Sequence, residues 1–326
     1  LKWLGPPRTA LIIKKPKDHG TNLALIEMAR WIKDNHPQLN VVLERGVCES
    51  LAHELPGVYV IPEVEEYTRV VDFVITLGGD GTVLHLASLF PREMPPIVSF
   101  SMGTLGFLLP FHVDHFRPVL TRLLQGADIT MLLRMRLVCS MHQADGTPII
   151  PPTEESENEG GGGALAIPSD HPPHHVIMNE VHVHRGRFPH LTSIDCFVDQ
   201  EFLTNAVADG LIVGTPTGST AYSLSAGGPI VHPALDSLLL TPICPRSLSF
   251  RTILLPPYSV VQLKITAASR GTADVSLDGR EVATLQVGQY LEVRASQYPV
   301  PCVNRVGHNV DWARDLNGLL KFNQNF

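Results

Sequence analysis

Residues 74–90 read VITLGGDGTVLHLASLF, an apolar run that ends at two glycines, an aspartate and a third glycine before a helical pattern begins. The run reaches back to residue 70 as VVDFVITL, and its β-branched, nearly unbroken apolar character is typical of a strand buried on both faces. A glycine turn between such a strand and a helix leaves backbone amides pointing outward, where phosphate oxygens bind. The stretch therefore predicts an open α/β sheet with a ligand site at the carboxyl end of this strand.

The surrounding first third of the chain repeats the alternation of strand and helix. Short apolar strands are expected at 9–15, 40–44 and 96–100. A helix follows the first of them, with apolar residues three or four apart at Leu25, Ile26, Met28, Ala29 and Ile32. A weak helix is expected near 48–55. Residues 114–126 predict a helix that Asp114 opens as N-cap and Gly126 closes. Together these elements favour a doubly wound parallel sheet in residues 1–128.

After residue 130 the pattern changes to short alternating strands and turns, which predict an antiparallel β domain over 129–307. The strands are expected at 176–184, 193–199, 260–267 and 290–295, and glycine-containing turns at 145–146, 209–210, 278–279 and 288. The acidic, Gly- and Pro-rich segment 151–173 is interpreted as a disordered surface insertion. Helical spacing returns at 311–320, and we expect a C-terminal helix within 308–326 to pack back on the first domain.

Composition limits the classes of protein that this chain can belong to. Its 326 residues, 44% of them hydrophobic, suit a globular protein of about two domains. The net charge of −7 argues against a nucleic-acid partner, and no apolar stretch reaches the length of a membrane span. The five cysteines are scattered and show no CxxC spacing, which indicates reduced and mostly buried thiols. The chain starts at Leu1, so we expect an N-terminal segment, and any targeting signal in it, to be missing.

The Gly78-Gly79-Asp80-Gly81 turn matches neither of the two common phosphate-binding fingerprints. Leu84 stands where a dinucleotide fingerprint needs its third glycine, and no Gly-Lys-Ser/Thr follows as in a Walker A loop. Asp80 could simply cap the helix, but three glycines around one acid are more than a cap requires. A carboxylate beside a phosphate cradle can accept or orient the proton of an attacking hydroxyl.

A second stretch, GTPTGSTAY within 208–233, gathers small and hydroxylated residues around one tyrosine. Its small residues would let the backbone approach a ligand, and Tyr222 would offer an aromatic wall with a polar tip. Thr217, Ser219 and Thr220 would offer hydrogen-bond donors. The alternative interpretation is an elaborate loop that only starts a helix.

A third feature is the polar pair Asn179-Glu180 inside the expected strand 176–184. Alternation would place Ile177 and Asn179 on one face and Glu180 on the other, and such a pair often forms hydrogen bonds only within a core. His182 and His184 share a face, but without a third ligand at a recognisable spacing they argue against zinc. We interpret His171, His174 and His175 as solvated parts of the insertion.

Taken together, the GGDG turn at 78–81, the Asn179-Glu180 pair and the run TPTGSTAY at 215–222 resemble the NAD kinase family. MGTLGF at 102–107 and TPICPRSLSFR at 241–251 strengthen the resemblance, which covers nearly the whole chain outside 151–173. Diacylglycerol kinases, sphingosine kinases and phosphofructokinases share GGDG, whereas the TPTGSTAY run is far more specific. The sequence of residues 189–210 and the C-terminal sequence GLLKFNQNF are most similar to the fungal mitochondrial NADH kinase branch.

The resemblance implies an N-terminal α/β domain, a C-terminal β-sandwich and an active site between them, in homodimers or homotetramers. It implies ATP-dependent phosphorylation of the 2′-hydroxyl of the adenosine ribose of NAD⁺ or NADH, which gives NADP(H). ATP would arrive with Mg²⁺, and no tightly bound cofactor or protein-held metal is expected. A mitochondrial matrix location follows from the branch alone, with the cytoplasm as the alternative.

The resemblance also assigns site residues by position. Asp80 would be the proton acceptor and the partner of the ribose hydroxyl, and Phe107 would lie against the adenine. The remaining residues would bind substrate: Gly78, Gly79, Gly81, Asn179, Glu180, Asp209, Thr217, Gly218, Ser219, Thr220, Ala221, Tyr222 and Ser225.

Two other functions compete with this expectation. A lipid kinase of the same superfamily would share GGDG and the two-domain plan, but it should lack the TGSTAY loop that this chain carries. A non-catalytic NAD(H)-binding regulator would resemble the family without turnover, and the intact Asp80 argues against it.

Overall fold

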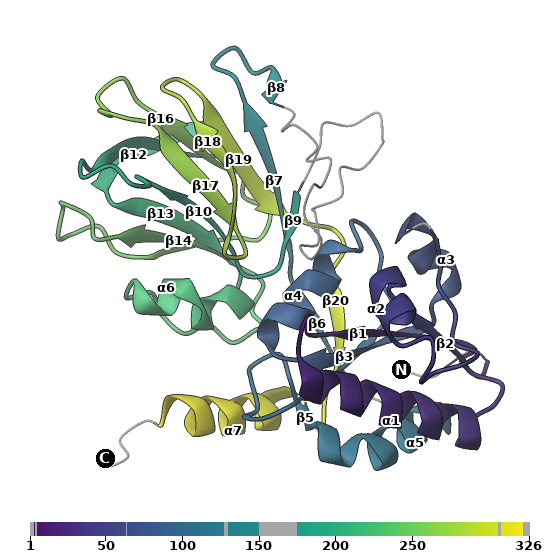
Figure 1. The fold of residues 1–326 in the computed structure, drawn as a ribbon. Coiled ribbons are helices and arrows are strands. Elements are labelled where there is room, and N and C mark those ends of the chain that lie inside the picture. The colour runs from purple at the N-terminus through teal and green to yellow at the C-terminus, as the bar shows by residue number, and fades with distance from the viewer. Residues whose placement is uncertain are drawn as a thin grey trace. The chain divides into compact units, whose positions relative to one another are not determined.

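The computed structural model describes residues 3, 5–62, 64–126, 130–149, 175–305 and 308–321 (Figure 1). The chain divides into two compact units, the first formed by Leu1–Leu133 with Val300–Phe326 and the second by Arg134–Pro299. The insertion predicted at 151–173 lies outside the described residues.

The first unit is built on a sheet with the strand order β2-β1-β3-β4-β20-β6, and β5 pairs with β4 beside this path. Where β1 pairs with β2 and β3, and where β4 pairs with β3, β5 and β20, the strands are parallel. The strands are β1 (Thr9–Lys14), β2 (Asn40–Leu43), β3 (Phe73–Gly78), β4 (Ile97–Ser101), β5 (Phe111–His112), β6 (Met131–Arg134) and β20 (Val300–Val303). The parallel sheet predicted from the alternating pattern is confirmed, whereas the pattern gave no sign of β20.

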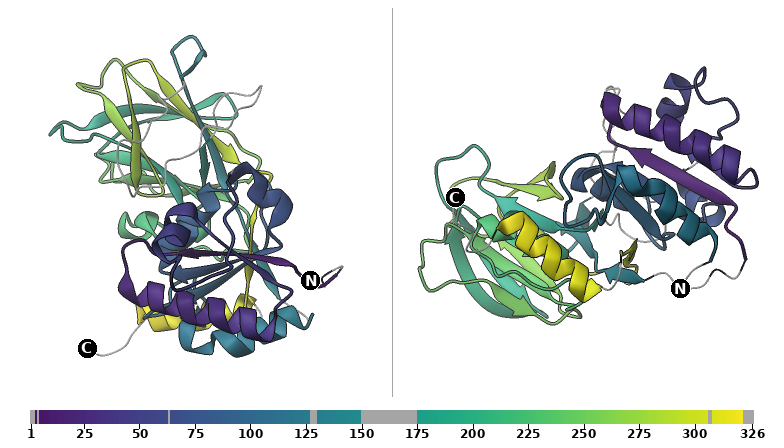
Figure 2. Two further views of the ribbon diagram at one scale, coloured as in Figure 1. Left: turned by 45° about the vertical axis from the view of Figure 1, so that its right-hand side comes forward. Right: turned by 90° about the horizontal axis from the view of Figure 1, so that it is seen from below.

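Helices cover both faces of this sheet. In Figures 1 and 2, α1 (His19–Asn35) and α5 (Phe116–Leu124) lie together on one face, where their apolar residues share a core with β1, β3 and β4. Helix α4 (Asp80–Ser88) packs against β1 and β3 from the other face. The remaining helices of the unit are α2 (Arg45–Ser50), α3 (Tyr67–Val70) and α7 (His308–Leu320), with 3₁₀ turns η1 (Val64–Glu66) and η2 (Val113–His115).

Helix α1 shows why the sequence pattern worked. Asp18 caps it by accepting a hydrogen bond from Thr21 N at 2.9 Å, which satisfies one of the amides that no helical carbonyl can reach. All five apolar residues predicted to face the core of this helix are buried. The prediction for α1 is therefore confirmed down to its buried face.

Two boundaries in this unit were predicted wrongly. The run 70–77 does not begin as a strand, because Val70 ends α3 and Val71 N donates to Tyr67 O at 2.9 Å. The predicted N-cap Asp114 instead lies inside η2, where its amide donates to His112 Nδ1, and α5 begins only at Phe116. Gly126 does close α5 as predicted, with a left-handed φ of 70°.

The second unit is a β-sandwich, in which two antiparallel sheets enclose one hydrophobic core. The first sheet has the order β15 (Ile253–Leu255), β14 (Leu238–Ile243), β13 (Gly210–Gly214), β10 (Glu180–His184), β17 (Ala273–Leu277), β18 (Arg280–Leu285). The second has the order β12 (Glu201–Ala208), β11 (Thr192–Val198), β16 (Val261–Ile265), β19 (Tyr290–Ala295), β7 (Leu137–His142), β8 (Pro148–Ile149), and β9 (His175–Ile177) also pairs with β7. The short elements η3 (Thr217–Thr220) and α6 (Tyr222–Ser225) follow β13.

The chain passes from one sheet of the sandwich to the other at two points that the sequence pattern misread. The expected single strand 176–184 is broken at Met178 and Asn179, because β9 pairs with β7 in one sheet and β10 pairs with β13 in the other. The expected turn at 209–210 is the second crossing, from β12 to β13. His175, interpreted as part of a solvated insertion, instead begins β9 and is partly buried.

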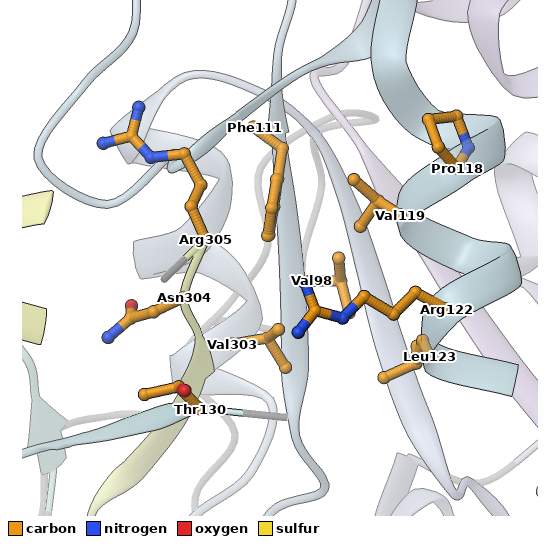
Figure 3. A pocket seen from close by; sticks show the side chains of 10 residues that line it. All are labelled: Val98, Phe111, Pro118, Val119, Arg122, Leu123, Thr130, Val303, Asn304 and Arg305. Atoms are coloured by element: carbon orange, nitrogen blue, oxygen red, sulfur yellow. The ribbon is translucent and has the colours of Figure 1, made fainter. Parts of the chain in front are cut away.

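Three further features complete the fold. All five cysteines are free thiols, and Cys139, Cys196 and Cys302 are buried, as predicted. None of the described helices combines the length and the apolar character that a membrane crossing needs. The first unit also has a pocket of about 280 Å³ between α5 and the sheet, lined by apolar side chains and by Thr130, Asn304 and Arg305, with the Arg122 guanidinium directed across it (Figure 3). No residue that the sequence assigned to the site lines this pocket.

Candidate active site

The GGDG turn joins β3 to α4, and its first glycine is required by close packing. A Cβ on Gly78 would lie 2.3 Å from Thr82 Oγ1 and 3.1 Å from Lys15 Cβ. Lys15 N also donates to Leu77 O at 2.8 Å, so the chain after β1 is fixed against the end of β3. Packing within the chain therefore requires glycine at position 78, where the chain turns from β3 into α4.

At the other two glycines of the turn, Gly79 and Gly81, packing within the described chain does not require glycine. A Cβ on Gly79 or on Gly81 would meet no atom within 4 Å, and Gly79 has a φ of −119° that any residue can adopt. A missing side chain at these two positions leaves the backbone amides at the start of α4 open to a close-approaching group. An anionic ligand is the kind of group that such amides bind.

Asp80 is the first residue of α4, and the segment 106–108 holds its carboxylate. Leu108 N donates to Asp80 Oδ1 at 3.3 Å. A Cβ on Gly106 would lie 2.5 Å from the same oxygen. Phe107 stands between these two contacts and is partly exposed, as Asp80 is. The first unit thus brings Asp80 and Phe107 together, and the positive end of the α4 dipole favours the ionised carboxylate.

In the second unit, the turn after β13 packs onto the break between β9 and β10. Thr215 Oγ1 donates to Met178 O at 2.6 Å, and Thr215 N donates to Asn179 O at 2.9 Å. A Cβ on Gly218 would lie 2.1 Å from Asn179 O. Gly218 therefore allows the TPTGSTAY run to lie directly against the Asn179-Glu180 pair.

Several hydroxyls of this run hold the turn together. Ser219 is fully buried, where its Oγ donates to Pro216 O at 2.7 Å and accepts from Val231 N at 2.9 Å. Thr217 Oγ1, also buried, accepts from Arg134 Nη1 at 3.2 Å. Thr220 Oγ1 donates to Thr217 O at 3.1 Å. Ser219 is thus a structural residue of the turn, whereas the partly buried Thr220 and Ala221 and the exposed Ser225 lie nearer its surface.

Tyr222 is 40% exposed and is the aromatic side chain that the turn presents to solvent. Its ring stands edge-on to His182, with 5.0 Å between the ring centroids. Partial burial raises the pKa of its phenol, and Cys244, Asp209 and Glu180 add to the effect through their negative charge. In the second unit, Asp209 and Glu180 therefore lie close enough to Tyr222 for their charges to affect the pKa of its phenol.

Glu180 is the unusual acid of this group. It is 7% exposed, and its Oε2 is buried without a hydrogen-bond partner. Burial, followed by the charge of Asp278, raises the pKa of Glu180 to about 7, although a backbone hydrogen bond from Tyr222 opposes the shift. Glu180 can therefore exist near neutral pH either as a hydrogen-bond donor or as a carboxylate.

Asp209 is held differently, at the crossing between the sheets. Arg185 Nε donates to Asp209 Oδ1 at 2.7 Å, and both side chains are about one third exposed. Asp209 N also donates to Ile243 O at 3.0 Å. An ion pair and a fixed backbone thus orient this carboxylate beside the Tyr222 turn.

The two histidines of β10 stack on each other, with 4.2 Å between ring centroids. His184 Nδ1 accepts from Gly186 N, so its other nitrogen carries the proton and contacts Ser276 Oγ at 3.3 Å. Burial, with a smaller effect of His184, lowers the pKa of His182 to about 3. Among the residues that the structure describes, no group of three His, Cys, Asp or Glu side chains is placed to hold a metal ion.

Sequence reasoning missed three residues that shape these groups. Gly106 belongs to the MGTLGF run, which the sequence analysis noted without giving the glycine a role. Asp278 was noted only as part of a turn, yet it contacts the backbone of Asn179 and Glu180. His182 was weighed only as a metal ligand, and its contact with Tyr222 depends on the crossing between sheets, which no local pattern indicates.

Comparison with known proteins gives consistent matches along the chain. The model of the ATP-NAD kinase N-terminal domain matches residues 10–128, and that of the ATP-NAD kinase C-terminal domain matches residues 178–305. A mitochondrial NADH kinase of Schizosaccharomyces pombe is 39% identical over 100% of this chain and 78% of its own length. A probable NAD kinase of rice is 38% identical over 99% of this chain, which spans 58% of that longer protein.

Solved structures agree with these matches. A yeast NADH kinase in complex with NADH superposes with a TM-score of 0.84 at 35% identity, covering 99% of this chain and 90% of that one. An NAD kinase from Archaeoglobus fulgidus in complex with ATP superposes with a TM-score of 0.66 at 20% identity over 95% of this chain, which shows a shared fold.

Proposed function

The chain belongs to the ATP-NAD kinase family and is an ATP-dependent kinase of NAD⁺ or NADH, and we propose that Asp80 and the Tyr222 turn carry its chemistry. The reaction phosphorylates the 2′-hydroxyl of the adenosine ribose and gives NADP(H). This membership displaces the lipid kinase and the non-catalytic regulator as interpretations. The assignments of individual residues below are ours.

The observation that carries the proposal is the pairing of Asp80 with two open glycines. The Asp80 carboxylate is held by Leu108 N at the first residue of α4, while Gly79 and Gly81 leave the neighbouring backbone uncovered. Phosphoryl transfer to a hydroxyl requires a group that takes or orients the hydroxyl proton and amides that stabilise phosphate charge. Asp80 supplies the first and the start of α4 supplies the second.

We assign recognition of the dinucleotide to the second unit. Asn179 and Glu180 offer an amide and a titratable carboxyl, which suit the hydroxyls of a ribose and the edge of an adenine. Asp209, Thr220, Ala221, Tyr222 and Ser225 form the remaining contacts in this assignment, and Phe107 of the first unit lies against the adenine. Thr217, Gly218 and Ser219 act mainly by shaping the turn, because their contacts are internal.

Magnesium enters this proposal with ATP. Mg²⁺ keeps several waters and commonly binds through substrate phosphates and one or two carboxylates. Bound there, Mg²⁺ would neutralise charge on the transferred group.

Compartment and assembly are further parts of the proposal. The names of two similar fungal proteins, from Schizosaccharomyces pombe and Saccharomyces cerevisiae, place those proteins in mitochondria, and we propose the mitochondrial matrix for this chain. The cytoplasm is the alternative, since the name of a similar NAD(+) kinase of Saccharomyces cerevisiae, 36% identical over 93% of the chain, states no organelle. We propose a homodimer or homotetramer, which sedimentation of the purified protein would test.

The direct test is a kinase assay with NAD⁺ and NADH at equal concentrations. We expect ATP with Mg²⁺ to yield NADP⁺ or NADPH, with the new phosphate on the 2′-oxygen by ³¹P NMR. Phosphorylation of diacylglycerol or sphingosine in place of the dinucleotide would overturn the assignment. So would binding of NAD(H) without turnover.

A further inference from the structure

The bend that carries Asn179 and Glu180 is held by one carboxylate from a distant hairpin. Asp278 Oδ2 accepts from Met178 N at 2.9 Å, and Asp278 Oδ1 accepts from Asn179 N at 2.7 Å and from Glu180 N at 3.2 Å. Three successive amides therefore converge on one side chain. Hydrogen bonds to an ionised acceptor are roughly twice as strong as neutral ones.

Asp278 is itself rigidly placed. It forms the tip of the β17–β18 hairpin with Gly279, and both residues have left-handed φ angles, of 47° and 79°. Such a pair of angles is that of a type I′ turn, which matches the twist of the flanking strands. Asp278 N also donates to Glu180 O at 3.0 Å, so the hairpin tip is tied to the bend through its backbone as well.

The opposite side of the bend is closed by Thr215. Its hydroxyl donates to Met178 O, and its amide donates to Asn179 O. Every backbone donor and acceptor from Met178 to Glu180 thus has a partner in Asp278 or in the segment after β13. None of these bonds uses the side chain of Asn179 or Glu180. The Glu180 carboxyl instead accepts a hydrogen bond from the backbone of Tyr222, which links the bend to the Tyr222 turn.

From this geometry we propose that Asp278 is a positioning residue for the dinucleotide: it fixes the bend so that Asn179 and Glu180 are presented together with the Tyr222 turn. The inference rests on the proposed assignment of dinucleotide recognition to these residues. A second consequence concerns charge, because Asp278 contributes to the raised pKa of Glu180. The other titratable groups around this pair are Arg280, beside Asp278, and Tyr222, beside Glu180. Asp209 and Cys244 in turn lie near Tyr222.

The test compares Asp278→Asn with Asp199→Asn. Asp199 is a matched control, because it also has a left-handed φ, of 52°, and its Oδ1 accepts from a backbone amide, Val260 N, at 2.8 Å. It joins β11 and β12 and has no contact with the bend. Asparagine tolerates the left-handed conformation at both positions, so both variants can keep their turn. Asp278→Asn perturbs three bonds from backbone amides, and Asp199→Asn perturbs one.

We expect Asp278→Asn to raise KM for NAD(H) by about 10-fold or more, the range for losing bonds to a charged acceptor. Asp199→Asn should change it less than about 3-fold, as expected for an exposed residue outside the bend, and KM for ATP should stay constant in both. The pH at which NAD(H) affinity changes should move downward only in Asp278→Asn, since the charge beside Glu180 is removed. Equal effects of the two variants on KM for NAD(H) would overturn the proposal.

A second variant covers the case in which Asp278→Asn does not fold. Thr215→Val loosens the same bend from its other side, and a rise in KM for NAD(H) without one for ATP would support the inference, whereas an unchanged KM would contradict it. Direct titration of NADH into the unmodified protein separates this question from the proposed function. Absence of NADH binding or turnover there would refute the proposed function, not the role of Asp278 in holding the bend.

Discussion

Gly106 and Asp80 meet so closely that a single methyl group on the glycine would lie 2.5 Å from the Asp80 Oδ1 atom. The carboxylate therefore rests against bare backbone, with Leu108 N–H as its donor, and is not simply free in solvent. This contact explains why a GGDG turn is accompanied here by a glycine in the MGTLGF run. A carboxylate that takes a proton must be held in place before the hydroxyl arrives.

We expect Asp80→Asn to lower kcat by roughly 10²–10⁴-fold, the usual contribution of a positioned acid or base. Asparagine keeps the size of the side chain, so NADH binding should change much less. Steady-state kinetics and NADH titration on the same preparation measure both quantities. Near-normal turnover would leave Asp80 as a helix residue without a role in proton transfer.

Gly106→Ala should impair the same step without touching the carboxylate chemically. The added Cβ must displace Asp80, and misplacing a catalytic group by about 1 Å can cost about 100-fold in rate. We expect kcat to fall by about 10–100-fold. Gly46→Ala is the control, because a Cβ there meets nothing within 4 Å in the exposed helix α2. Equal kcat values for both variants would show that the contact is irrelevant to turnover.

The sequence predicted those parts of the fold in which local pattern and burial agree. The strands β1 and β4 are apolar and buried along their whole length, and helix α1 has apolar residues on one buried face. In these elements the period of the apolar residues predicts both the type of element and its burial. The run 70–77 was misjudged because Val70 and Val71 have strand propensity yet belong to the end of α3 and the residue after it. At these two residues the helical hydrogen bond from Val71 N to Tyr67 O outweighs the strand propensity of valine.

The sequence assigned residues to the candidate site but did not predict how the chain arranges them. Asn179 and Glu180 were placed on opposite faces of one strand, whereas they lie at a crossing between two sheets. A crossing leaves no local signature, because its backbone groups are satisfied by Asp278 and Thr215, which lie about 100 and 36 residues away in the sequence. Ser219 was expected at a ligand, but its bonds to Pro216 and Val231 use it within the turn.

Replacing 151–173 by a short Gly-Ser linker should leave Tm and activity nearly unchanged. The described ends of the segment make this feasible: Ile149 pairs with Met141 and His175 with Cys139 along the same strand, β7. Partners two residues apart on a strand are separated by about 7 Å, which a few residues can bridge. Differential scanning fluorimetry and the kinase assay test the prediction, and a loss of several degrees would contradict it.

Glu180→Gln should change how stability depends on pH. The pKa of Glu180 is about 7 in the folded chain and 4.5 as its ordinary value, so between these pH values the folded state holds more protons than the unfolded state. The free energy of unfolding should therefore fall as pH rises from about 4.5 to 7, by at most about 3 kcal/mol from this residue. In the variant this fall should be absent.

His182 acts with the opposite sign, which makes the comparison with the variant necessary. Its pKa is about 3 in the folded chain against an ordinary value of 6.5, so its contribution to stability rises over that window. Urea unfolding of both proteins at pH 5 and pH 7 isolates the Glu180 term. An identical pH dependence in the two proteins would mean that Glu180 is not buried in its neutral form.

Tyr222→Phe tests which nucleotide the turn after β13 recognises. The ring would keep its edge-on packing against His182, while the loss of one hydrogen bond, worth about 0.5–1.5 kcal/mol, should raise KM for NAD(H) by roughly two- to twelve-fold. Tyr222→Ala also removes the aromatic wall and should cost more. KM for ATP should change little in either variant, and Tyr258→Phe, at a tyrosine that is 82% exposed, should leave both KM values unchanged. If KM for ATP rises while that for NAD(H) does not, the turn serves the phosphoryl donor, because the loss of a binding contact raises KM for the substrate that the contact touched.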